Sequence, residues 1–168
     1  REDSTLRCDN LDVTFNDSDY NLQTLKATEK IHIVDKKGSL FNEAFGDQAT
    51  WDLKNKVTTL TGQPFAIMKE GNKRQILSPR VLLYEDENSV LCEGGGSLYE
   101  KGGESLSKEG SEETDINVKW SKKMIYNDNL KKASFFGEAQ VTQGGQKLNS
   151  DQIDTYLNSD KEINKIIA

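Results

Sequence analysis

A short pattern near both ends of the chain constrains the fold more than any other feature of the sequence. Leu6–Asp12 reads LRCDNLD and Leu148–Asp154 reads LNSDQID. In the first copy, apolar residues alternate as far as Cys8 and alternate again from Leu11, but in the opposite phase. A strand that keeps one face toward a core needs an inserted residue to make this change, and Asp and Asn favour such sites. The pattern therefore predicts a bend within a β-strand.

A second pattern follows each bend pattern and sets a glycine between alternating apolar or small residues. Its glycines are Gly62, Gly94 and Gly137, and Glu29 occupies the same slot in the first unit. These four sequence positions are 33, 32 and 43 residues apart. Self-similarity at a near-constant period is typical of repeat architectures. We therefore expect about five tandem units, with Ala168 falling inside the fifth, so that either the chain is a fragment or the native protein continues.

The segments between these patterns predict the fold class. Clusters of Asn, Asp, Gly, Ser and Lys separate short alternating runs, and no segment has a good amphipathic helical period. We predict an all-β fold in a single domain spanning residues 1–168. Residues 99–114, YEKGGESLSKEGSEET, hold almost no apolar side chains and account for the longest interval. They are predicted to form a flexible inserted loop.

Composition and charge exclude several classes of partner. Hydrophobic residues make up 34% of the chain and charged residues 30%, which suits a thin, strand-rich fold with its apolar residues on one face. The net charge of −6 leaves no general basic surface, so nucleic acid is excluded as a partner. The local basic residues Lys69, Lys73, Arg74 and Arg80 are predicted to lie on solvated turns and strand faces. No apolar run approaches the length of a membrane-spanning helix.

The sequence contains no recognisable catalytic, cofactor or metal motif. His32 is the single histidine and stands between two isoleucines that should face inward, so its ring should face solvent. We therefore predict a protein that is not an enzyme and has no catalytic residues, cofactor or metal site. Trp51, Trp120 and the many acidic residues suggest carbohydrate binding or hydrolysis as a further alternative.

Two cysteines, Cys8 and Cys92, are too few for a disulfide framework and form no metal-binding pair. Both lie in strand-like contexts, which favours buried free thiols. A single disulfide remains the alternative if the compartment is oxidising.

Residues 57–96 and 135–154 contain the full order of return strand, glycine, strand, turn and bend strand. This arrangement resembles the OstA-like family, which includes the lipopolysaccharide transport proteins LptA and LptC, along the whole chain apart from residues 99–114. The resemblance implies an open, slightly twisted β-jellyroll of stacked antiparallel strands. The chain departs from the family pattern at Glu29, at Arg80, which takes the bend aspartate position of the third unit, and at the inserted segment.

The resemblance also implies a function. It predicts a non-enzymatic periplasmic protein that holds lipopolysaccharide-type acyl chains in an apolar groove during transport to the outer membrane. A signal peptide or an N-terminal membrane anchor is expected to have preceded Arg1. The expected partners are lipopolysaccharide or a related lipid and proteins of the same fold that pair at strand edges, including head-to-tail homo-oligomers. The alternatives are a structural β-repeat interaction module and an LptC-like anchored component without a lipid conduit of its own.

The candidate groove residues are large apolar side chains at alternating positions, where burial of each contributes about 1.5–3 kcal/mol. Leu6 and Leu25 belong to the expected inner face. The residues predicted to contact lipid are Leu11, Val13, Phe15, Ile31, Ile33, Phe45, Trp51, Leu60, Leu82, Tyr84, Leu98, Trp120, Phe135, Val141 and Ile153. Whether they line an open groove or fill a core depends on whether the two sheets close.

Overall fold

The chain is built of β-strands in the computed structural model, which describes residues 4–35, 41–103, 114–159 and 162–168. The strands are β1 (Ser4–Arg7), β2 (Asn10–Phe15), β3 (Leu22–Asp35), β4 (Glu43–Asp52), β5 (Val57–Glu70), β6 (Arg74–Tyr84), β7 (Ser89–Glu93), β8 (Gly96–Gly103), β9 (Thr114–Trp120), β10 (Lys123–Asn127), β11 (Lys132–Gln143), β12 (Gln146–Leu157) and β13 (Ile163–Ile167). The prediction of an all-β fold is confirmed.

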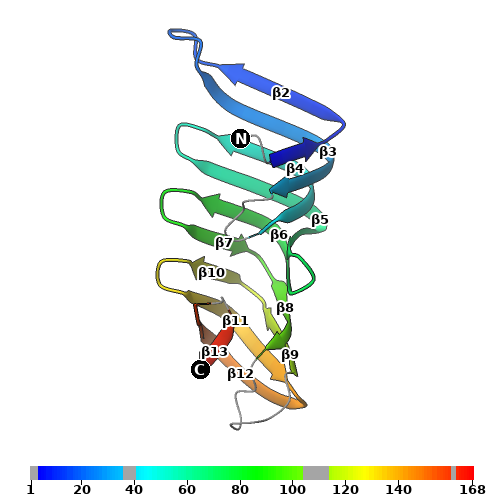
Figure 1. Ribbon diagram of the computed structural model, residues 1–168, viewed down its shortest axis with the longest axis vertical. Coiled ribbons are helices and arrows are strands. Elements are labelled where there is room, and N and C mark those ends of the chain that lie inside the picture. Colours follow the sequence, from blue (N-terminus) through cyan, green and yellow to red (C-terminus); the bar gives the residue numbers. More distant parts are fainter. Residues whose placement is uncertain (1–3, 36–40, 104–113, 160–161) are drawn as a thin grey trace.

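The strands stack one above the other along the long axis of the molecule (Figure 1). All pairings are antiparallel, and the main path runs β1-β3-β4-β5-β6-β7-β10-β11-β12-β13. Three strands lie off this path: β2 pairs with β3, β8 with β6 and β9, and β9 also with β11. The result is one continuous sheet that folds over on itself.

The fold-over is produced by a bend in each long strand, which divides the sheet into two panels. Panel A comprises β2, β7, β10, β13 and residues 22–28, 48–52, 57–61, 80–84, 132–136 and 152–157. Panel B comprises β1, β8, β9 and residues 31–35, 43–46, 66–70, 74–78, 139–143 and 146–150. Between the two panels lies a slot, and the apolar core fills much of it.

The predicted bends fall where the repeat places them. In β11, Gly137 and Glu138 both have positive φ and oppose the single residue Asp151 of β12. In β3, Glu29 and Lys30 also have positive φ and oppose the single residue Asp47. Two residues opposite one is the geometry of a β-bulge, which bends the strand locally. The predicted bend at the Asp motif is confirmed at Asp151, and the structure adds that the glycine position of the neighbouring strand lies opposite it.

Cross-strand registers show which side chains share the inner face. In panel A, Leu60, Val81 and Cys92 follow one another across β5, β6 and β7, and the row continues through Met124, Phe135 and Ile153. In panel B, the corresponding row is Met68, Ile76, Leu98, Val118 and Val141. All of these side chains belong to the buried core.

The prediction of a loop over residues 99–114 is wrong at both of its ends. Residues Tyr99 to Gly103 continue strand β8, and Thr114 begins β9. Backbone pairing between β8 and β9 stabilises this part despite its polar sequence. Residues 104–113 lie outside the described part of the chain.

Candidate functional site

The slot between the panels is the candidate site, because it gathers most of the predicted groove residues. Seven of them are buried in one core cluster to which both panels contribute: Ile31, Leu60, Leu98, Trp120, Phe135, Val141 and Ile153. The rings of Trp120 and Phe135 are tilted, with centroids 5.4 Å apart. In this part of the slot the apolar side chains pack against one another as a core does.

The N-terminal end of the slot differs, because its apolar side chains are open to solvent. Leu11, Val13 and Phe15 on β2 are exposed by 50%, 42% and 54%. Ile33 and Trp51 are half-buried and pack against the edge of the core. Scattered exposed apolar residues are ordinary, but a contiguous patch marks a binding surface.

The open patch is contiguous with the core through the strand register. Leu11 lies opposite Ala27, which lies opposite Ala49. Val13 lies opposite Leu25, which lies opposite Trp51. The inner rows that begin in the patch therefore run on into the buried part of the slot.

Phe45 was predicted to face the slot, and the structure places it on the outer face. Phe45 pairs in register with His32 and Ile67, and its ring stacks on the His32 ring at 4.5 Å. The strand phase flips across Asp47, so that Ala44 and Ala49 point inward instead. The prediction that Phe45 faces the slot is therefore wrong, because the bend at Asp47 reverses the strand phase between Phe45 and Trp51.

Leu82 and Tyr84 were also assigned to the wrong face. Their strand neighbours Val81 and Leu83 belong to or pack against the core, whereas Leu82 lies opposite Thr59 and Leu91. The phase changes at Pro79, a single residue that opposes four residues of β5. Because residues 81–84 are all apolar, alternation could not reveal the phase from the sequence.

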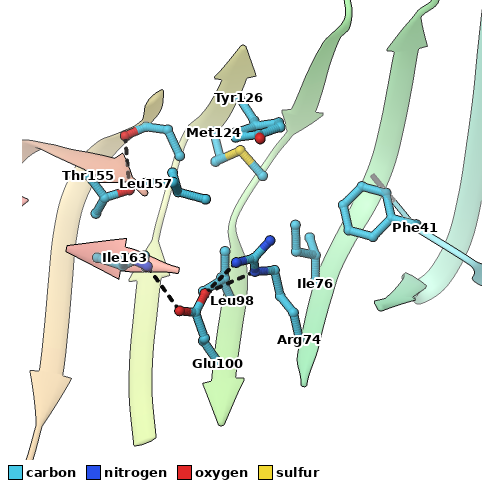
Figure 2. A pocket seen from close by; sticks show the side chains of 11 residues that line it. Phe41, Arg74, Ile76, Leu98, Glu100, Met124, Tyr126, Thr155, Leu157 and Ile163 are labelled. Atoms are coloured by element: carbon cyan, nitrogen blue, oxygen red, sulfur yellow. Dashed lines mark hydrogen bonds and ion pairs between the residues drawn. The ribbon is translucent and has the colours of Figure 1, made fainter. Parts of the chain in front are cut away.

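A small cavity of about 20 Å³ remains in the slot beneath β13. Figure 2 shows its lining, to which both panels contribute. Ile76 and Leu98 come from panel B, and Met124, Leu157 and Ile163 come from panel A. The space suits one water molecule at most, so an acyl chain can occupy this part only if the panels separate.

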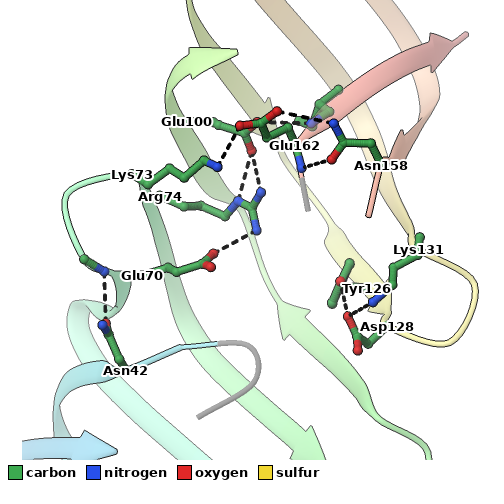
Figure 3. A network of polar contacts seen from close by, with 12 residues as sticks. Asn42, Glu70, Lys73, Arg74, Glu100, Tyr126, Asp128, Lys131, Asn158 and Glu162 are labelled. Carbon is green, nitrogen blue, oxygen red and sulfur yellow. Dashed lines mark hydrogen bonds and ion pairs between the residues drawn. The ribbon is translucent and has the colours of Figure 1, made fainter. Parts of the chain in front are cut away.

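Four charged side chains and one backbone N–H close the slot above this cavity. We call this group the clasp: Lys73, Arg74, Glu100, Glu162 and Ile163 (Figures 2 and 3). Arg74 donates from Nε and Nη2 to Oε2 of Glu100, at 3.0 and 2.7 Å. The backbone N of Ile163 donates to Oε1 of Glu100 at 3.1 Å, and Lys73 Nζ donates to Glu162 at 2.8 Å. The last two contacts join panel B to panel A.

The clasp changes the earlier interpretation of the basic residues. Arg74 was predicted to be solvated, but its side chain is 8% exposed and that of Glu100 is 0% exposed. The Arg74 guanidinium also contacts Glu70 at 3.1 Å. Glu100 was missed because it lies in the polar segment interpreted as a loop. Only its register opposite Arg74 shows that it points inward.

The electrostatics of the clasp favour its charged form. The hydrogen bond from Lys73 lowers the pKa of Glu162, assisted by one from Asn158. The same contact with Glu162 raises the pKa of Lys73. Both groups therefore stay ionised at neutral pH.

The cysteines are free thiols, with Cys92 buried and Cys8 half-buried. Burial raises the pKa of Cys92 to about 12. This thiol is therefore protonated and a poor nucleophile at neutral pH.

The histidine and the tryptophan with polar ring atoms that could serve a site make structural contacts instead. His32 lies on the outer face, as expected, and its Nε2 is 2.8 Å from Glu43. Trp120, considered as part of a sugar-binding shelf, is buried, and its Nε1 donates to the carbonyl of Gly94. Among the described residues no group of three or more His, Cys, Asp or Glu could hold a metal ion, and no helix could cross a membrane.

Comparison with known proteins supports the architecture. No protein-family model matches the sequence, and no curated protein matches it. Among solved structures the chain is similar to LptH, the LptA-homologous periplasmic component of the lipopolysaccharide transport device of Pseudomonas aeruginosa. The TM-score is 0.59 at 17% identity, over 74% of this chain and 79% of the LptH chain. At this identity the likeness establishes an LptA-like β-jellyroll fold.

Proposed function

We propose that this chain is a non-enzymatic periplasmic protein that binds the acyl chains of lipopolysaccharide or a related lipid and helps to carry it toward the outer membrane. The observation that supports this most strongly is the open N-terminal end of the slot. There, Leu11, Val13 and Phe15 present an apolar inner surface to solvent and lead into the buried rows. The likeness to a periplasmic transport component, LptH, agrees with this role.

Contacts to acyl chains, rather than to phosphates, would supply the binding energy. The chain carries a net charge of −6, which disfavours a phosphorylated head group. The positive charge of Arg74, which lies at the slot, is already paired with the carboxylates of Glu100 and Glu70. The head group would therefore remain in solvent outside the slot.

Assembly with proteins of the same fold belongs to the same proposal. Strand β2 pairs only with β3, so its other edge is unpaired within the described residues. Unpaired edges readily accept another strand, and a head-to-tail contact of this kind propagates without closing. Sedimentation velocity over a range of concentrations should show self-association, and a monomer at every concentration would contradict this part of the proposal.

A second candidate is a structural β-repeat interaction module, or an LptC-like anchored component, without a lipid conduit of its own. The closely packed C-terminal part of the slot favours this candidate. There, the core and the clasp leave only about 20 Å³ beneath β13. In that case the open end would be a surface for a protein partner.

Native mass spectrometry of protein extracted gently from the cell envelope separates the two candidates. The lipid-binding protein should carry an adduct whose mass matches an acylated lipid. A structural module should give the bare chain under the same conditions. Extraction of the V13K variant supplies the control, because a lysine in the open patch should reduce the adduct while the fold is retained.

A further inference from the structure

We propose that the clasp is a side gate of the slot, through which an acyl chain enters between the panels near β13. The inference rests on the proposed lipid-binding function and adds a specific entrance to it. Figure 3 shows Lys73 and Arg74, at the start of β6 in panel B, close to Glu162, which directly precedes β13 of panel A. Opening the clasp would expose the apolar side chains of the cavity beneath.

Among the described residues, the ion pair that joins the two panels at the clasp is a weak one. The Lys73 and Glu162 side chains are exposed by 40% and 27%, and ion pairs at such positions contribute little to stability. Ile163 also joins the panels: its backbone N donates one hydrogen bond to Glu100, and its side chain, 2% exposed, packs in the core cluster and would be exposed by opening. Local opening of an edge strand held in this way needs no global unfolding.

The strong contact of the clasp lies within one panel and survives opening. Arg74 on β6 and Glu100 on β8 are register partners within panel B. When β13 moves away, Glu100 keeps both hydrogen bonds from Arg74. No buried charge is therefore left without a partner, which would be the main obstacle to opening.

The lining beneath the clasp suits a flexible hydrocarbon chain. Leu98, Met124, Leu157 and Ile163 surround the cavity. Methionine adapts its shape readily to different neighbours. The inner rows connect this region to the rest of the slot, so a chain that enters here reaches the same apolar interior.

Charge reversal tests the gate directly. In K73E, repulsion from Glu162 replaces attraction, so the clasp should open more often. We expect uptake of the fluorescent fatty acid cis-parinaric acid, followed by stopped flow, to become about fivefold faster, since exposed ion pairs have small energies. The double variant K73E/E162K should restore the rate of the original protein.

The variant R80E serves as a matched control, because it shows how far a change of net charge alone alters the uptake of an anionic probe. Arg80 pairs with Glu93 in an exposed ion pair whose two strands both belong to panel A. R80E changes the net charge by the same amount as K73E, but it breaks no contact between panels. Equal rates for K73E and R80E would overturn the gate.

Hydrogen exchange of the β13 amides measures the opening without lipid. K73E should accelerate exchange at residues 163–167, and the double variant should restore it. If K73E accelerates exchange but no variant takes up the probe, the proposed lipid function fails and the role as an entrance fails with it. If the probe binds but K73E alters neither its uptake rate nor the exchange, the lipid function stands and the gate is wrong.

Discussion

Glu100 is a fully buried carboxylate, and its surroundings show how a charge is tolerated inside an apolar slot. Its Oε2 accepts two hydrogen bonds from the Arg74 guanidinium, and its Oε1 accepts one from the backbone N of Ile163. A buried charge is tolerated only while a counter-charge pairs with it, and for Glu100 that counter-charge is Arg74 of the same panel.

Removing the charge of Glu100 should therefore destabilise the protein strongly. We expect E100Q to lower the free energy of unfolding by about 3 kcal/mol, because Arg74 would lose its closest counter-charge. E93Q is the matched control, since Glu93 pairs with Arg80 at an exposed site and should cost less than about 1 kcal/mol. Urea denaturation measures both values, and equal losses would contradict the assignment of a buried pair.

The two cysteines should differ in reactivity. At pH 8 a maleimide should label Cys8, which is half-buried, and leave Cys92 unmodified, since burial raises the pKa of Cys92 to about 12. Peptide mass spectrometry identifies the labelled site, and both thiols should react in denaturant. Rapid labelling of Cys92 in the folded protein would show that its part of the core opens freely.

The face of a side chain could be predicted where apolar and polar residues alternate, and not where they do not. Trp120 and Ile153 lie in alternating strands and point into the slot, and their contact with lipid stays a prediction. Leu82 lies in an unbroken apolar run, so only the bend at Pro79 decides its face. Glu100 could not be predicted, because its environment is created by β6, which lies about one repeat earlier in the chain.

At the scale of the strand, the fold depends on the bend in each long strand. The bend in β3 is an exception to the repeat, because Glu29 takes the position that is glycine in the later units. Glu29 has φ of +64° where other units place glycine, and its side chain is exposed. A non-glycine residue in this region is strained, so E29G should raise the free energy of unfolding by up to about 1 kcal/mol. K26G should lower it by about 0.5–1 kcal/mol, because glycine in a regular strand loses more entropy on folding. A loss of stability in E29G would contradict the strained-bend account.

Strand β13 should respond to acid through Glu162. The folded-state pKa of Glu162 lies below its ordinary value of 4.5. The stability that the ionised Glu162 side chain contributes to the folded protein is therefore fully present above pH 4.5. It is lost as the pH falls through the lower folded-state pKa. E162Q should therefore be less stable than the original protein at pH 7, by up to about 1 kcal/mol, and the difference should be smaller at pH 3. Thermal unfolding of both proteins at the two values measures this, and a constant difference would rule out the ion pair as its source.

At the scale of the whole molecule, the slot is graded from an open N-terminal end to a packed C-terminal part. The repeat predicted the stacked, bent sheet because each unit bends at an equivalent place, and the structure confirms this. The gradation itself was not predictable, since it depends on how closely two panels approach. Leu11 and Ile153 stand at equivalent positions in the opening motif, yet Leu11 is exposed by 50% and Ile153 by 0%.

Site-specific photo-crosslinking in cells tests the central claim that lipid contacts the inner face of the slot. A photoreactive amino acid at Trp51, on the inner row at the open end, is compared with the same residue at Thr50, its outward-facing neighbour, and at Leu82 on the outer face. The account predicts a lipid adduct at Trp51 and none at Thr50 or Leu82, with all three variants folded. Equal labelling at the three positions, or none at Trp51, would contradict it.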